Sequence, residues 1–155
     1  MPDEHRDRPY AVHHTSLTVS DLDRSIAFYR DVLGLEVVMQ QEKDRGYLAE
    51  ITGYPDVHIR MAHLKLPGGE HRIELFQYLS PPGIRADVEP RNVGAPHICF
   101  LVEDIHPTYE RLRAAGTEVL SEPIELESGI NKGGFGLYFR DPDGITMELF
   151  QAPRR

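Results

Sequence analysis

Short runs of alternating apolar and polar residues recur along this chain, and the first run has a counterpart later in the sequence. After His14, apolar side chains occupy alternate positions at Leu17 and Val19. After His97, the run Ile-Cys-Phe-Leu-Val repeats this alternation. Because the side chains of a strand point to opposite faces in turn, each run predicts a strand that covers a core with one face only.

A helical pattern follows each of these strands, over residues 21–33 in the first copy and 105–115 in the second. Each pattern begins beside an aspartate that can cap a helix N-terminus and ends before a glycine, which suits the turn that closes a helix. The aspartates are Asp21 and Asp104, and the glycines are Gly34 and Gly116.

Three strand-like runs come after each helix, and a turn sequence joins the last two. The runs are residues 35–41, 57–66 and 72–79 in the first copy and 117–121, 135–140 and 145–150 in the second. The order strand, helix, strand, strand, strand therefore occurs twice. This predicts an α+β fold made of two βαβββ modules.

The duplication divides the chain into a first module at about residues 10–79, a linker at about 80–96 and a second module at about 97–152. We expect the modules to form one domain over residues 1–155. The linker is rich in Pro and Gly and is long enough for a module to pair with a module of a second copy. Together with the family resemblance given below, this leads us to expect a homodimer, and the sequence leaves open whether the modules pair within or between chains.

Two histidines and two glutamates fall on the strand faces that point away from the predicted helices. They are His14, Glu74, His97 and Glu148. Any one of them alone would be read as a solvated side chain on a polar sheet face. Their recurrence at equivalent places in both copies favours a site for a divalent metal, and Zn, Ni, Co, Mn or Fe(II) would each accept this donor set. His13 is a rival of His14, but parity places it on the helix side.

Several short motifs together carry a resemblance to a known family. They are His14 with Val19-Ser-Asp-Leu22, Ala27-Phe-Tyr29 with Leu33-Gly-Leu35, Ile73-Glu-Leu75, His97 with Val102-Glu-Asp-Ile105, and Asp141-Pro-Asp-Gly144 with Met147-Glu-Leu149. Over about residues 10–152 the chain resembles the vicinal oxygen chelate superfamily. This superfamily includes glyoxalase I, methylmalonyl-CoA epimerase, extradiol ring-cleaving dioxygenases, and fosfomycin and bleomycin resistance proteins. The resemblance implies a curved open barrel of paired modules around a metal ion that polarises substrate oxygen atoms.

Glyoxalase I matches most closely, because its two histidine and two glutamate ligands correspond to the four residues named above. Small bacterial glyoxalases usually also have an arginine four residues after the first ligand and an asparagine four residues after the second, and both hold glutathione. This chain has Thr18 and Tyr78 at those places. The resemblance thus implies the metal chemistry without the usual glutathione contacts.

From these features we expect a lyase or isomerase that acts on a small carbonyl or oxygen-chelating substrate through an enediolate or enolate. Glu148 is the first candidate for the base that moves the proton, and Glu74 is the second. One alternative is an Fe(II)-dependent extradiol-type dioxygenase, since Phe76, Tyr78 and Phe150 suit a flat aromatic substrate. Another is a resistance protein that binds a small-molecule drug, a class that typically lacks a complete set of metal ligands.

Composition excludes other classes of partner. The chain has 25 acidic residues against 17 Lys and Arg, and its net charge of −8 is the wrong sign for a protein that neutralises nucleic-acid phosphates. No stretch reaches the roughly 18 to 20 apolar residues of a membrane span, and Met1–Pro9 is charged without an apolar signal segment. We therefore expect a cytoplasmic protein with a small-molecule substrate.

Three further features have weaker implications. The single cysteine, Cys99, excludes an intramolecular disulfide, and its apolar surroundings predict a packed thiol rather than a nucleophile. The glycine-rich segment Gly129–Gly136 is flexible enough for a lid but lacks the spacing of a phosphate-binding loop. His58, Arg60 and His63 lie on a predicted strand of alternating pattern, and an exposed polar face explains them as well as substrate contact does.

Overall fold

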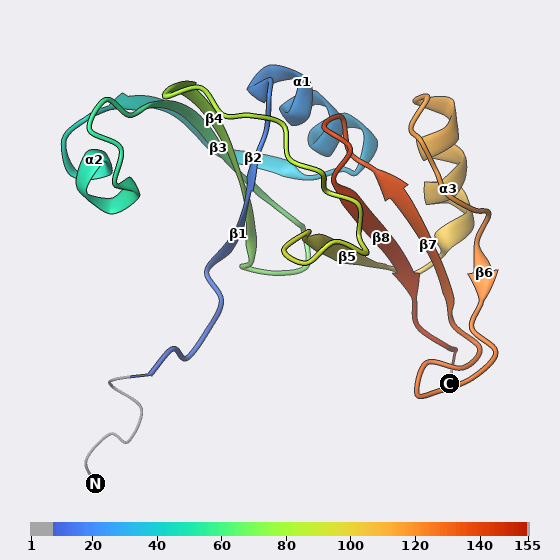
Figure 1. The fold of residues 1–155 in the computed structure, drawn as a ribbon. Coiled ribbons are helices and arrows are strands. Elements are labelled where there is room, and N and C mark those ends of the chain that lie inside the picture. Colours follow the sequence, from blue (N-terminus) through green and yellow to red (C-terminus); the bar gives the residue numbers. More distant parts are fainter. Residues whose placement is uncertain (1–7, 155) are drawn as a thin grey trace, which may run out of the picture. The chain divides into compact units, whose positions relative to one another are not determined.

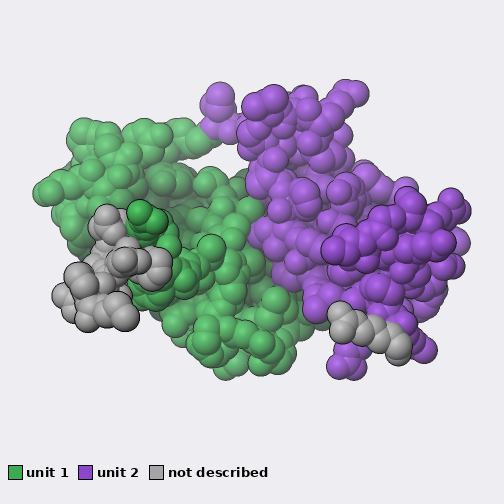
Figure 2. Space-filling model, turned by 90° about the horizontal axis from the view of Figure 1, so that it is seen from below, with its two compact units in different colours: residues 1–83 green, residues 84–155 purple. Residues whose placement is uncertain are grey.

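The computed structural model describes residues 8–154, which belong to two units, residues 1–83 and 84–155 (Figures 1 and 2). Each unit contains a mixed four-stranded sheet, with strand order β1-β4-β3-β2 in the first and β5-β8-β7-β6 in the second. The two orders are equivalent, so the duplication predicted from the sequence is present in the fold. Residues 1–7 of the charged stretch Met1–Pro9 lie outside the described part.

Unit 1 follows the predicted order with one addition. It consists of β1 (His14–Thr18), α1 (Leu22–Ala27), the π-helical turn η1 (Phe28–Val32), β2 (Glu36–Asp44), α2 (Tyr47–Thr52), β3 (His58–Lys65) and β4 (Arg72–Ser80). β1 is parallel to β4, and the other neighbours are antiparallel. The helix predicted at 21–33 is α1 continued by η1, and the side chain of Asp21 caps it by accepting a hydrogen bond from the backbone N–H of Arg24.

Unit 2 has the same plan. It consists of β5 (His97–Val102), α3 (Ile105–Ala114), β6 (Ile124–Glu125), β7 (Phe135–Arg140) and β8 (Thr146–Gln151). The prediction of a regular strand at 117–121 was wrong, because within that range Val119 forms only an isolated bridge to Phe139, and β6 begins later. Pro123 has no N–H to donate, so it interrupts strand pairing between the two segments.

The helix α2, between β2 and β3, was not predicted from the sequence. It begins after Gly46 and ends at Gly53, whose φ of 75° is the left-handed conformation that glycine adopts without strain. Its buried residue, Leu48, belongs to an apolar cluster with Val57, Ile59 and Met61. A helix of six residues is too short to show a helical period in the sequence, and its single buried residue makes that period harder still to detect.

The repeated Glu-Leu-Phe-Gln motif attaches each helix to its sheet. The leucine of each copy is buried in the core. Oε1 of Gln77 accepts a hydrogen bond of 3.2 Å from the backbone N–H of Leu22, and Oε1 of Gln151 accepts one of 2.8 Å from Ile105. These bonds satisfy N–H groups in the first turns of α1 and α3. Because neighbouring positions alternate, the glutamate of each motif lies on the other face of the sheet, as predicted.

The boundary between the units falls inside the predicted linker 80–96. From Arg85 onward the linker is bonded to unit 2. The guanidinium of Arg85 donates to the carbonyl oxygen of Asp143 at 2.8 Å, and the guanidinium of Arg140 donates to Oε1 of Glu89 at 3.0 Å. In residues 8–154, moreover, no helix has the length and apolar character needed to span a membrane.

Candidate metal-binding half-sites

In unit 1, His14 and Glu74 lie side by side on the sheet face opposite α1. β1 and β4 are parallel neighbours, and their register places Ser16 opposite Glu74. Nε2 of His14 is 3.4 Å from Oε2 of Glu74, longer than a good N–H···O hydrogen bond. Two donors that each lie about 2.1 Å from one cation, at a tetrahedral angle, are about 3.4 Å apart. The spacing therefore fits two ligands of one metal ion.

Unit 2 repeats this arrangement with His97 and Glu148. β5 and β8 are parallel neighbours, and Cys99 holds the place opposite Glu148 that Ser16 holds in unit 1. Nε2 of His97 is 3.5 Å from Oε2 of Glu148. In each unit, one of the two predicted histidines thus lies next to one of the two predicted glutamates.

A third residue, from the neighbouring antiparallel strand, adjoins each pair. His63 of β3 is opposite Glu74, and its Nε2 is 2.7 Å from Oε1 of that glutamate. Tyr138 of β7 is opposite Glu148 at the equivalent position. The two glutamates differ in exposure, since the Glu74 side chain is 7% exposed and the Glu148 side chain is 24% exposed. The exposed polar face considered for His63 from the sequence is wrong, because its side chain is buried beside Glu74.

Strand parity predicted His13 on the helix side of the sheet, but its side chain contacts that of His14. Both side chains are exposed, and their Nδ1 atoms are 2.8 Å apart, so one donates a hydrogen bond to the other. A partner at Nδ1 leaves Nε2 of His14 free to face Glu74, which is the usual way in which a metal-binding imidazole is oriented. In unit 2 the corresponding residue is Pro96.

Two protonated groups adjoin the carboxylate of Glu148. Partial burial of the sulfur raises the pKa of the Cys99 thiol to about 11, and the charge of Glu148 and a hydrogen bond to it act in the same direction. Burial also raises the pKa of the Tyr138 phenol, again with help from Glu148. The prediction of a packed thiol was wrong, because Cys99 is exposed on the site face. Its raised pKa nevertheless argues against a nucleophile, which requires the thiolate.

The site face of unit 1 becomes apolar and aromatic beyond Glu74. Phe76 and Tyr78 are the next two residues of β4 on this face, and their ring centroids are 6.1 Å apart. Tyr54, just after α2, contacts the ring of Tyr78 edge-on at 6.1 Å. Burial, followed by the effects of Tyr54 and Glu74, raises the pKa of Tyr78, so its phenol is neutral near pH 7.

Unit 2 is more open at the corresponding position. Gly136 of β7 is paired with Phe150, which is the place that Met61, paired with Phe76, holds in unit 1. A Cβ atom added to Gly136 would lie 3.9 Å from Oε1 of Glu148. Unit 2 therefore has no side chain at this position beside Glu148, whereas unit 1 has Met61 at the equivalent position.

Each unit contains one pair of candidate ligands. Within residues 8–154, no three His, Cys, Asp or Glu side chains are grouped so that they could hold a metal ion. A catalytic metal usually has at least three protein ligands. One His–Glu pair is therefore fewer ligands than such a metal usually has.

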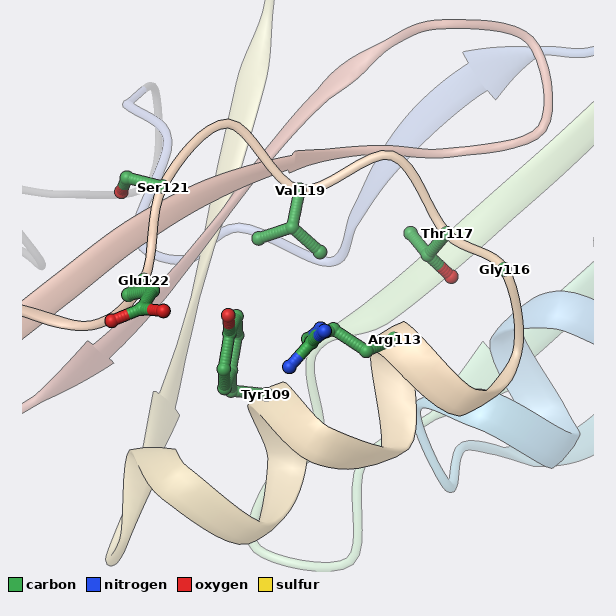
Figure 3. A pocket seen from close by; sticks show the side chains of 7 residues that line it. All are labelled: Tyr109, Arg113, Gly116, Thr117, Val119, Ser121 and Glu122. Carbon is green, nitrogen blue, oxygen red and sulfur yellow. The ribbon is translucent and has the colours of Figure 1, made fainter.

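A cavity of about 380 Å³ lies elsewhere in unit 2, beside α3 (Figure 3). It is lined by Tyr109, Arg113, Gly116, Thr117, Val119, Ser121 and Glu122. In Figure 3 the side chain of Arg113 extends next to Tyr109, with its guanidinium carbon 5.6 Å from the ring centroid. The lining includes neither His97 nor Glu148, so this cavity is not part of the candidate site.

Comparison with known proteins agrees with the motifs. The family described as "Glyoxalase/Bleomycin resistance protein/Dioxygenase superfamily" matches residues 11–149. A 2-epi-5-epi-valiolone epimerase of Actinomyces sp is 31% identical, with 92% of this chain and 80% of that protein covered. A probable lactoylglutathione lyase of Vibrio cholerae is 32% identical, with 92% and 91% covered.

A crystal structure of a glyoxalase family protein from Bacillus cereus superposes with a TM-score of 0.85 at 27% identity, and covers 97% of this chain and 99% of that one. The match extends over both βαβββ units and both His–Glu pairs. The chain therefore belongs to the glyoxalase/bleomycin resistance protein/dioxygenase superfamily, which is the vicinal oxygen chelate superfamily that its motifs predicted.

Proposed function

We propose that this protein is a metal-dependent lyase or isomerase that moves a proton next to a carbonyl group of a small oxygen-chelating substrate. The observation that carries the proposal is the repeated His–Glu pair, with Nε2–Oε2 distances of 3.4 and 3.5 Å at equivalent registers. Two pairs with this spacing supply the two imidazoles and two carboxylates that a divalent first-row ion accepts. Curated relatives named as an epimerase and a lyase support the reaction class.

In this proposal His14, Glu74, His97 and Glu148 hold one divalent ion, which is Zn, Ni, Co, Mn or Fe(II). When bound, the ion would supply Lewis-acid polarisation of the substrate carbonyl. The two pairs come either from one chain or from two chains of a homodimer. Both arrangements bind one ion per chain. Mixing His14→Ala chains with His97→Ala chains distinguishes them, because only pairing between chains restores an intact site.

Glu148 is the base that removes the proton next to the carbonyl. Its side chain is more exposed than that of Glu74, 24% against 7%, so it can reach a substrate more easily. The Cys99 thiol donates a hydrogen bond to it and helps to hold the carboxylate toward the site. Glu74 is the second candidate for the base.

The substrate in this proposal is not a glutathione adduct. The exposed Thr18 and the partly buried Tyr78 occupy the places where small bacterial glyoxalases have the arginine and asparagine that hold glutathione. Thr18 has no charge, and Tyr78 is packed against Tyr54. Neither residue offers the cation or amide that would recognise the charged ends of that tripeptide.

The test combines metal analysis with proton exchange. We expect the purified protein to contain a divalent metal, and we expect it to catalyse deuterium uptake from D₂O next to the carbonyl of a cyclic hydroxyketone, measured by NMR. The hemithioacetal of methylglyoxal and glutathione should give far less exchange. Glu148→Gln should lower exchange by about 10²–10⁴-fold, the usual contribution of a general base. Exposed Glu50→Gln is the matched control.

Full exchange by the Glu148→Gln variant, or undiminished exchange after the metal has been removed with a chelator, would overturn the proposal.

A second candidate is an Fe(II)-dependent ring-cleaving dioxygenase. The partly buried rings of Phe76 and Tyr78 lie on the same strand face as Glu74 and suit a flat aromatic substrate. This candidate predicts oxygen consumption when the Fe(II)-loaded protein is given a catechol, and the lyase or isomerase does not. A drug-binding protein, by contrast, would bind its ligand with no metal present.

A further inference from the structure

His63 is a buried histidine next to the candidate metal ligands of unit 1. It lies near the middle of β3, is 8% exposed, and is opposite Glu74 across the sheet. Its Nε2 is 2.7 Å from Oε1 of Glu74, while Oε2 of the same carboxylate faces His14 at 3.4 Å. Each oxygen of Glu74 therefore has its own histidine neighbour.

The two distances separate the roles of these histidines. A spacing of 2.7 Å is that of a short hydrogen bond between a ring N–H and a carboxylate. Two ligands of one metal ion are about 3 Å or more apart, so His63 is too close to Glu74 to share a cation with it. The two distances therefore fit His14 and Glu74 as ligands of one ion, and His63 as a hydrogen-bond donor to Oε1 of Glu74.

The second ring nitrogen of His63 supports a role for this side chain as a hydrogen-bond donor to Glu74. Within residues 8–154, Nδ1 of His63 has no hydrogen-bond partner and is buried. With the proton on Nε2, Nδ1 is an unpaired acceptor, which is more tolerable in a protein interior than an unpaired donor. The hydrogen bond to Glu74 is therefore what fixes the ring tautomer and its orientation.

On the basis of the proposed function, we propose that His63 is a positioning residue. It holds Oε1 of Glu74, so that Oε2 is presented to the metal together with Nε2 of His14. A carboxylate held at one oxygen binds a cation through the other without a further loss of rotational freedom. Loss of a hydrogen-bond partner of a metal ligand typically weakens metal binding by about 10–100-fold.

The experiment measures Co²⁺ binding to the full-length protein by competition with a coloured chelator, together with the absorption spectrum of the bound Co²⁺. His63→Leu removes the donor, and we expect about 10–100-fold weaker binding and an altered spectrum. In His63→Asn the amide is too short to reach Glu74, and we expect the same loss. In His63→Gln the amide N–H can take the place of Nε2, and we expect affinity within about threefold of wild type.

His58 offers a matched control on the same strand. Its Nε2 is also 2.7 Å from a glutamate oxygen, Oε1 of Glu42, but this pair is on the surface and away from the candidate ligands. His58→Leu should leave Co²⁺ affinity and spectrum unchanged. Thermal melts in the absence of metal identify any variant that is not folded, and the comparison then uses His63→Asn against His63→Gln.

Two failures can be distinguished. If the wild-type protein binds no divalent ion, the proposed function fails. If the wild type binds Co²⁺ and folded His63→Leu or His63→Asn binds it equally well, with the same spectrum, the role of His63 is refuted. Equal weakening in folded His63→Gln and His63→Asn would also refute it, because the donor would then not be what matters.

Discussion

The half-sites of unit 1 and unit 2 have the same His–Glu pair in different surroundings. Glu74 is buried and hydrogen bonded to His63, while Glu148 is more exposed and lies opposite Tyr138 and Cys99. The ligand types and their spacing are the same in both units, but the neighbours are not. The difference is that the carboxylate of Glu74 is buried against a histidine, whereas the carboxylate of Glu148 is more accessible and adjoins a thiol and a phenol.

The two sheets also differ in the side-chain contacts on their helix-facing sides. In unit 1 the guanidinium of Arg60 binds the carboxylate of Asp23 through two nitrogens, at 2.9 and 3.0 Å. In unit 2 the equivalent places are taken by Phe135 and His106, whose rings are 5.8 Å apart. A salt bridge in one copy is thus replaced by a ring contact in the other, while the glutamine that caps the helix is unchanged.

The largest expected effect comes from removing one histidine of either pair. If both pairs hold one ion, His14→Ala and His97→Ala should each weaken metal binding by more than the roughly 100-fold that loss of an outer partner can cost, and turnover should be lost. Metal competition and activity assays measure this, with exposed His58→Ala as the control. A strong loss in one variant and none in the other would break the equivalence of the two pairs.

A smaller effect is expected where the two glutamines cap their helices. Gln151 is buried and makes a bond of 2.8 Å, so Gln151→Leu leaves the N–H of Ile105 unpaired and should cost about 1–3 kcal/mol. Gln77 is less buried and its bond is 3.2 Å, so Gln77→Leu should cost less, about 1 kcal/mol. Urea denaturation of both variants measures the difference. Equal costs would show that burial does not distinguish the two caps.

The smallest effect is expected at the Asp23–Arg60 salt bridge. The hydrogen bond to Arg60 is the main reason that the pKa of Asp23 lies below its ordinary range. The salt bridge therefore adds to the free energy of unfolding above about pH 4, which is the pKa of an aspartate in an unfolded chain. This contribution is lost as the pH falls through the lowered pKa of the folded state. Because the pair is exposed, Asp23→Asn should shift the urea midpoint slightly at pH 7 and low salt.

The same Asp23→Asn comparison provides its own controls. At pH 2 the wild type and the variant should have the same midpoint, and 1 M NaCl at pH 7 should reduce their difference. A difference that grows as the pH falls would contradict a stabilising role for the ionised aspartate.

The two His–Glu pairs could be predicted from the sequence because they depend on the alternation of residues along each strand and on the repeat of one motif. Strand parity places His14 and Glu74 opposite the helix, and the repeat of the motif supports the same choice in unit 2. The role proposed for His63 could not be predicted, since it depends on which residue of β4 lies opposite β3. That register is fixed by the turn between the strands and by packing of the whole sheet.

Two elements escaped prediction for local reasons. The helix α2 has one buried residue, Leu48, so it has no visible period. The strand expected at 117–121 is interrupted because Pro123 follows it, and its pairing with β7 continues only at Ile124–Glu125. Whether the two His–Glu pairs hold one ion, as proposed, depends on how the modules assemble, which strand pattern alone does not determine.

The missing side chain at Gly136 has a consequence for how this protein can diversify. An alanine there would meet its nearest neighbours at 3.8–3.9 Å, which is ordinary van der Waals contact, so small residues are tolerated. Larger residues would narrow the approach to Glu148 without replacing any candidate ligand. In the proposed site, position 136 is thus a place where selection can adjust which molecules reach Glu148 without changing a candidate ligand.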